Sequence, residues 1–150
     1  MYEIDEKATS FIKQFEGLSL TPYTCPAGIR TIGYGHVITQ EEQYKPDSFQ
    51  KITNDEADRI LENDLNKIRD SIFRNIYAPL THPQFIAILS FTFNVGGGAL
   101  QRSSLRQKIN RLEHETVPFE LNKWVFASGR KLPGLIKRRY FEGLMYKGII

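Results

Sequence analysis

The chain has 150 residues, of which 41% are hydrophobic, 25% charged and 12% aromatic, and its formal net charge is +3. This length and mixture favour one globular domain and exclude disordered and fibrous chains. The longest apolar run covers only residues 85–89, too short to span a bilayer, and a single cysteine excludes internal disulfides and multi-cysteine zinc sites.

The first predicted element is a short amphipathic helix. Its apolar residues recur at helical spacing on one face: Ala8, Phe11, Ile12 and Phe15. We expect this helix to end near Glu16-Gly17. Residues 18–39 follow, where prolines and glycines punctuate short stretches rich in Thr, Ile and Tyr. This pattern predicts a small twisted hairpin or a three-stranded sheet.

A long helix is predicted over residues 53–74. Thr53 and Glu56 form a capping box, in which each side chain bonds the other residue's backbone N–H. Behind it a narrow apolar stripe recurs every three or four residues: Ala57, Leu61, Leu65, Ile68 and Ile72. A helix that is apolar only on a narrow stripe fits a strut between two lobes.

The C-terminal half predicts a helical bundle. One helix begins at Thr81 and stops at Gly96, and shorter helices cover residues 104–112 and 118–126. A last helix follows Pro133, with an apolar stripe of Ile136, Tyr140, Leu144 and Met145. The prediction is a mostly helical α+β fold: an N-terminal lobe with a short antiparallel sheet (about 1–55), a connecting helix (about 53–74) and a helical lobe (about 75–150).

Three residues could carry chemistry. Glu16 has the apolar neighbours Phe15 and Leu18, a setting that suits a general acid. Cys25 comes nine positions later and Thr31 six after that, and the Pro- and Gly-containing turns would bring all three to one cleft. Each alone is weak evidence, because a glutamate at a helix end is usually solvated and a lone cysteine is usually a buried apolar group.

The whole string is more specific. Glu16, eight residues, Cys25, five residues and then Thr-Ile-Gly-Tyr-Gly-His at residues 31–36 resembles the active-site segment of phage-type lysozymes, or endolysins, of glycoside hydrolase family 24. Members of that family carry Glu, then Asp or Cys, and then Thr at this spacing. Weaker similarity at residues 53–64, 93–96, 103–105 and 132–139 extends the resemblance over nearly the whole chain, as one lysozyme-like catalytic domain over residues 1–150.

The resemblance implies that the protein hydrolyses the β-1,4 bond between N-acetylmuramic acid and N-acetylglucosamine in peptidoglycan and so lyses bacteria. Glu16 would protonate the leaving glycosidic oxygen, and Thr31 would orient the attacking water. Cys25 stands where Asp is commoner, and it would stabilise the oxocarbenium-like state, activate water or attack the anomeric carbon. A thiol needs a lowered pKa to be charged at neutral pH, so inversion and retention both stay open.

The resemblance also implies supporting residues. Val37, Phe93 and Ser104 match positions that line the substrate cleft, although Phe93 equally suits core packing on its helix. Relatives hold the catalytic glutamate with an arginine from a C-terminal helix. Arg138 and Arg139 are the candidates, with a solvated pair as the alternative.

His36 is expected to be structural. By similarity it pairs with Asp64 on the connecting helix. The other two histidines lie far away in the sequence and offer no chelating spacing, so we expect no metal and no cofactor.

The charge pattern bears on partners and location. Residues 1–75 hold nine Lys/Arg against thirteen Asp/Glu, and residues 76–150 hold eleven against four. The basic half fits peptidoglycan strands, and its scattered cations argue against nucleic acid. The N-terminus is acidic where an export signal would be basic and then apolar. We therefore expect a monomer made in the bacterial cytoplasm, acting on periplasmic or cell-wall peptidoglycan and released by a holin, unless an export segment was removed.

Two other functions stay open. A lytic transglycosylase needs only one acid/base glutamate and would release 1,6-anhydromuramic products. A non-catalytic wall-binding module is the second alternative, and the presence of both Glu16 and Thr31 argues against it.

Overall fold

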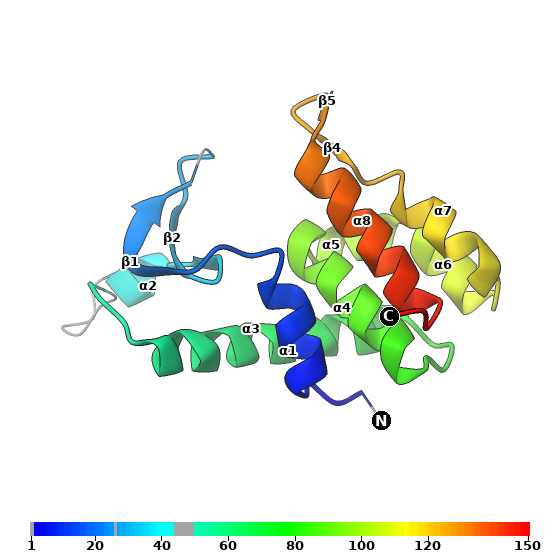
Figure 1. Ribbon diagram of the computed structural model, residues 1–150, viewed down its shortest axis with the longest axis horizontal. Coiled ribbons are helices and arrows are strands. Elements are labelled where there is room, and N and C mark those ends of the chain that lie inside the picture. The colour runs from blue at the N-terminus through cyan, green and yellow to red at the C-terminus, as the bar shows by residue number, and fades with distance from the viewer. Residues whose placement is uncertain (1, 26, 44–49) are drawn as a thin grey trace. The chain divides into compact units, whose positions relative to one another are not determined.

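The computed structural model describes residues 2–25, 27–43 and 50–150 (Figure 1). The chain divides into two compact units, one of residues 4–66 and one of residues 1–3 with 67–150, so the division falls inside the long helix α3 (Asn54–Asn75). The mostly helical α+β class is confirmed. Within the described ranges, no helix combines the length and apolarity needed to cross a membrane.

The unit of residues 4–66 begins with α1 (Glu6–Lys13), whose buried face is the predicted one. Asp5 caps it by accepting a hydrogen bond from Ala8 N–H at 3.0 Å. The predicted end near Glu16-Gly17 was wrong, because α1 ends at Lys13. The N–H groups of Phe15 and Glu16 bond carbonyls three residues back and form a tighter turn.

The predicted small sheet is confirmed. It contains β1 (Ser19–Thr24), β2 (Arg30–Gly33) and β3 (His36–Val37), antiparallel in the order β1-β2-β3. Tyr23 pairs with Thr31, and Thr31 pairs with Val37 on the other side. The sheet packs on a small core of Ile32, Ile38, Ile52 and Ala57. A short helix, α2 (Gln40–Gln43), was not predicted.

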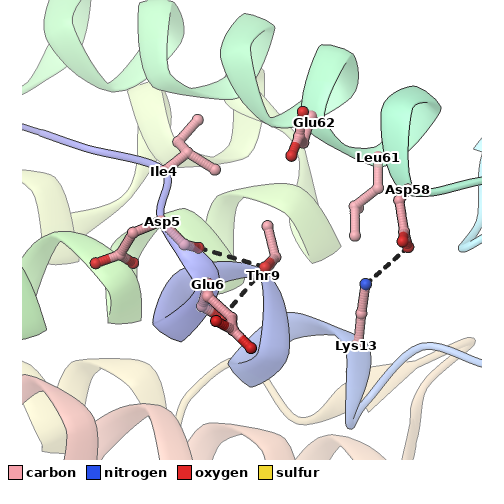
Figure 2. A pocket seen from close by; sticks show the side chains of 8 residues that line it. All are labelled: Ile4, Asp5, Glu6, Thr9, Lys13, Asp58, Leu61 and Glu62. Atoms are coloured by element: carbon pink, nitrogen blue, oxygen red, sulfur yellow. Dashed lines mark hydrogen bonds and ion pairs between the residues drawn. The ribbon is translucent and has the colours of Figure 1, made fainter. Parts of the chain in front are cut away.

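Helix α3 begins where its capping box predicts. Thr53 Oγ1 accepts from Glu56 N–H at 3.1 Å, and Glu56 Oε1 accepts from Thr53 N–H at 3.3 Å. Four residues of the predicted stripe are buried: Ala57, Leu61, Leu65 and Ile72. Figure 2 shows α1 and α3 facing each other across a polar pocket of about 340 Å³, with Lys13 Nζ 2.7 Å from Asp58 Oδ1.

The second unit is helical. Its elements are α4 (His82–Val95), α5 (Gly97–Arg102), α6 (Ser104–Asn110), η1 (His114–Thr116), α7 (Val117–Leu121), β4 (Phe126–Ala127), β5 (Arg130–Lys131) and α8 (Pro133–Tyr146). A capping box between Thr81 and Gln84 starts α4, and residues 85–92 of that helix are all buried. This helix therefore forms the centre of the unit's core.

Two predictions for this unit were wrong in detail. The helix expected over residues 118–126 ends at Leu121, and Phe126 belongs to the β4–β5 hairpin. The turn of that hairpin has positive φ at both Ser128 (51°) and Gly129 (76°), the conformation that suits a two-residue hairpin turn. The helix expected over residues 104–112 ends at Asn110.

The buried face of α8 also differs from the predicted stripe. Ile136 and Tyr140 are exposed, whereas Arg138, Arg139 and Glu142 are buried. A charged group enters a core only with partners, so the apolar pattern alone could not identify this face.

Candidate active site

Cys25 and Thr31 lie together where β1 turns into β2. Cys25 N–H donates to the Ile29 carbonyl at 2.9 Å, and the Cys25 carbonyl accepts from Gly28 N–H at 2.8 Å. Thr31, on β2, is only 5% exposed, and its hydroxyl donates to the same Ile29 carbonyl at 3.1 Å. The turn therefore fixes both residues through one backbone group.

The thiol of Cys25 is half-buried, unlike the inert core cysteine that a lone cysteine usually is. A backbone hydrogen bond from Ile29 lowers the pKa of Cys25 below its ordinary value, opposed by burial, and the Ala27 backbone and the nearby Thr31 side chain lower it further. The environment thus favours the thiolate, the form that a charged substitute for Asp requires.

Glu16 lies in the turn after α1 and is half-buried. Its carboxylate faces the turn between β2 and β3, because a Cβ added to Gly35 would lie 3.4 Å from Glu16 Oε2. Leu18, expected to shield the carboxylate, is 42% exposed and gives only partial cover. All three predicted catalytic residues belong to the unit of residues 4–66.

Replacing Gly35 with Ala is expected to lower both stability and activity. Gly35 has φ +87°, where a side chain is strained by about 1–2 kcal/mol, and the new methyl group would touch the Glu16 carboxylate. Gly148→Ala is the matched control, because Gly148 has φ +74° and no atom of the described residues lies within 4 Å of an added Cβ. Thermal unfolding should show similar losses for the two variants, whereas only Gly35→Ala should slow lysis at a temperature where both are folded. Equal lysis rates for the two variants would show that contact with the Glu16 carboxylate does not affect activity.

His36 joins three elements. Its Nδ1 lies 2.8 Å from Asp64 Oδ2 on α3, as the resemblance implies, and its Nε2 lies 3.2 Å from both carboxylate oxygens of Glu42 on α2. We call His36, Glu42 and Asp64 the histidine clasp. Glu42 was missed from the sequence, although Thr39 and Glu42 form a capping box that could have revealed it.

The clasp makes stability depend on pH. The hydrogen bond to Asp64 raises the pKa of His36 above its ordinary value, burial opposes this, and Glu42 adds to the rise. A raised folded pKa means that the contribution is complete below the unfolded value of about 6.5 and is lost as pH rises through the folded pKa. Burial raises the pKa of Glu42, but hydrogen bonds from Thr39 and His36 hold it below its ordinary value. The Glu42 contribution is therefore lost as the solution becomes acidic.

Asp64→Asn is expected to lower the free energy of unfolding by about 1–3 kcal/mol at pH 6, because it removes a charge-assisted hydrogen bond. The difference from wild type should shrink as pH rises through the pKa of His36. Denaturant unfolding between pH 5 and 9 measures it, and the folded variant should still lyse cells. Asp58→Asn, which removes a more exposed pair with Lys13, should change stability little across this range. An NMR titration that gives His36 a pKa at or below about 6.5 would contradict the clasp.

The residues predicted to bind substrate differ in their solvent exposure. Val37, on β3, is 51% exposed, and Phe93, on α4, is half-buried. Ser104 is exposed at the start of α6, where its hydroxyl donates to Glu120. Across the described ranges, no group of three or more His, Cys, Asp or Glu side chains could hold a metal ion.

Arg138 and Arg139 do not form a solvated pair. Both are buried and contact Glu142: Arg138 Nε is 3.3 Å from Oε2, and Arg139 Nε is 2.8 Å from Oε1, an ion pair not aligned as a hydrogen bond. Ser90 donates to Glu142 at 2.6 Å, and Arg139 donates to Asn94 at 2.6 Å. Their predicted role toward Glu16 stays a prediction.

A small antiparallel sheet combined with a chiefly helical chain is the lysozyme-like fold, and known proteins share it over nearly their full length. The muramidase domain of SpmX from Asticaccaulis excentricus superposes with a TM-score of 0.84 at 29% identity, covering 97% of this chain and 98% of that one. P22 lysozyme superposes with a TM-score of 0.84 at 26% identity, covering 98% and 99%.

The sequence comparisons agree with the fold. The phage lysozyme family matches residues 13–142. An endolysin of Acyrthosiphon pisum secondary endosymbiont phage 1 is 36% identical over 148 residues, covering 96% of this chain and 97% of the relative. The chain therefore belongs to the phage lysozyme family. It is a lysozyme, a glycosidase that degrades peptidoglycan.

Proposed function

We propose that this enzyme hydrolyses the β-1,4 bond between N-acetylmuramic acid and N-acetylglucosamine, with Glu16, Cys25 and Thr31 as catalytic residues. The observation that carries the proposal is the β1–β2 turn, which holds a thiol of lowered pKa beside a buried threonine. Glu16 supplies the carboxyl group at the family's spacing in the same unit.

Glu16 acts as the general acid. Cleavage of a glycosidic bond leaves an alkoxide unless the departing oxygen receives a proton, so an acid on that side lowers the barrier. The carboxylate lies against Gly35, which has no side chain to cover it. Gly35 therefore keeps side-chain atoms of its own away from this side of the carboxylate.

Cys25 acts on the opposite face of the sugar. As a thiolate it places negative charge near the developing oxocarbenium ion, or attacks the anomeric carbon to form a thioglycosyl intermediate that water then hydrolyses. The Thr31 side chain lies beside the thiol, where it helps to lower the pKa of Cys25. Thr31 is thereby also placed to orient the water. Val37, Phe93 and Ser104 are the proposed substrate contacts.

The proposal extends to location and assembly. Peptidoglycan lies outside the cytoplasmic membrane, so an enzyme made in the cytoplasm needs passage across it, for which we propose a holin. We propose that residues 1–150 form one catalytic domain that acts as a monomer. Sedimentation of the purified protein tests whether it is a monomer. Lysis of cells that express it with and without a holin tests the proposed passage across the membrane.

Purified sacculi test the activity. The wild-type protein should reduce the turbidity of a sacculus suspension while new reducing sugar ends accumulate in the supernatant. Falling turbidity without new reducing ends would indicate a lytic transglycosylase or cleavage of a bond that is not glycosidic, and unchanged turbidity with a folded protein would refute catalysis.

A further inference from the structure

An apolar groove of about 530 Å³ lies on the unit of residues 1–3 and 67–150, lined by Tyr2, Phe73 and residues 76–80. Two of its aromatic side chains are exposed: Phe73 is 52% exposed and Tyr77 is 73% exposed. Both rings line the same groove, which makes it a candidate binding surface. None of the proposed catalytic residues belongs to this unit.

The ring of Phe73 belongs to a stack of aromatic rings. Tyr2 stacks on buried Phe85 with centroids 4.8 Å apart and an interplanar angle of 6°, and Phe73 stacks on Tyr2 at 5.0 Å and 25°. One face of Phe73 is thus covered, which fixes the ring. The exposed part of this side chain therefore belongs to a rigid support and not to a freely rotating ring.

The segment that carries Tyr77 is also fixed. The N–H groups of Tyr77 and Ala78 donate to Asn110 Oδ1 at 2.8 and 3.3 Å, and Leu80 N–H donates to the Tyr2 hydroxyl at 3.0 Å. Arg106 holds the Tyr77 ring, with its guanidinium carbon 5.8 Å from the ring centroid and Nη2 3.2 Å from the hydroxyl. A surface already ordered in this way loses little entropy when a ligand binds.

We propose that this groove binds sugar units of the peptidoglycan strand, as a substrate-holding site additional to the catalytic residues. The face of an aromatic ring carries partial negative charge, and the axial C–H groups of a pyranose carry partial positive charge, so a sugar packs on Phe73 and Tyr77. The hydroxyl of Tyr77 and the guanidinium of Arg106 offer hydrogen bonds to the sugar's rim. The inference rests on the proposed function only in taking peptidoglycan as the substrate.

Charge supports the same occupant. Among the residues that the structure describes, those that line the groove include no acid, and Arg106 stands at its edge as a cation. Peptidoglycan carries carboxylates on its stem peptides, so a strand seated on the rings brings negative charge toward Arg106. A second point of attachment also raises the local concentration of the polymer at the catalytic residues.

Binding to purified sacculi tests the site, in a Glu16→Gln background so that the wall is not digested. Tyr77→Ala should weaken binding about tenfold, since it removes one aromatic contact, and Tyr77→Trp should retain it. Phe119→Ala is the matched control, because Phe119 is 68% exposed with Lys123 Nζ 5.2 Å from its ring and lies outside the groove. In the Glu16 protein, Tyr77→Ala should slow sacculus digestion while turnover of a short soluble glycan stays within about twofold.

The outcomes separate the possibilities. Wild-type sacculus binding by Tyr77→Ala, or an equal loss in Phe119→Ala, overturns the inference. So does a Tyr77→Ala effect seen only with phosphatidylglycerol vesicles, which indicates a lipid surface, or only as loss of a dimer, which indicates a second copy. Digestion of sacculi by the Glu16→Gln protein would instead refute the proposed catalytic role. Because Tyr77 is exposed, its variants should keep the wild-type melting temperature, and Tyr77→Trp guards against a general loss of folding.

Discussion

Glu16→Gln is expected to abolish lysis while leaving the protein folded. Gln keeps the shape of Glu and can occupy the same place beside Gly35, but it has no acidic proton to give to the leaving oxygen. Loss of general acid catalysis lowers the rate by about a hundredfold or more. The measurement is the initial rate of turbidity loss of purified sacculi at equal concentrations of variant and wild type.

The control for this variant is Glu62→Gln, which changes an exposed carboxylate on α3 in the same unit. It should lyse sacculi at the wild-type rate. The melting temperature of Glu16→Gln should stay close to that of wild type, because the residue lies in a turn outside the buried core. Substantial residual lysis by folded Glu16→Gln would show that another group is the acid.

Cys25→Ala is expected to lose most of the activity, about a hundredfold, whereas Cys25→Asp should retain it. Ala offers no negative charge and no nucleophile to the anomeric carbon. Asp restores the group that is commoner at this position in the resembling family, and it is charged at neutral pH without help. Sacculus lysis by the three proteins measures the difference, and thermal unfolding confirms that each is folded.

Chemical modification and pH distinguish the thiol's role from packing. Iodoacetamide should inactivate the wild type and spare Cys25→Asp. With the thiolate as the proposed active form, wild-type activity should fall as pH drops through the pKa of Cys25, and Cys25→Asp should stay active to lower pH. Full activity of Cys25→Ala would mean that the thiol has only a packing role. This result would favour the alternative that the enzyme is a lytic transglycosylase.

The parts of the fold that were predictable are those set by neighbours in the sequence. Capping boxes at Thr53 and Thr81 place the starts of α3 and α4, because the hydrogen bonds that start these helices are made within four residues. The β4–β5 hairpin was missed because Phe126 and the residues before it also fit a helical pattern, and only the turn at Ser128 and Gly129 reveals it.

In the candidate site, proximity was predictable for residues that lie close together in the sequence. Cys25 and Thr31 share a turn of seven residues, so their spacing already determines that they lie together. The burial of Arg138 and Arg139 was not predictable in this way. Arg138 bonds Ser90 and Arg139 bonds Asn94, both on another helix, and a buried guanidinium becomes favourable only when such long-range partners are present.

Mass spectrometry of the soluble fragments released from purified sacculi tests the central claim most directly. The proposed hydrolysis adds the elements of water across the glycosidic bond, so the fragments should end in reducing N-acetylmuramic acid. Fragments that end in 1,6-anhydromuramic acid, lighter by one water, would show that the enzyme is a lytic transglycosylase. Release of no fragments by the folded protein would contradict catalysis altogether.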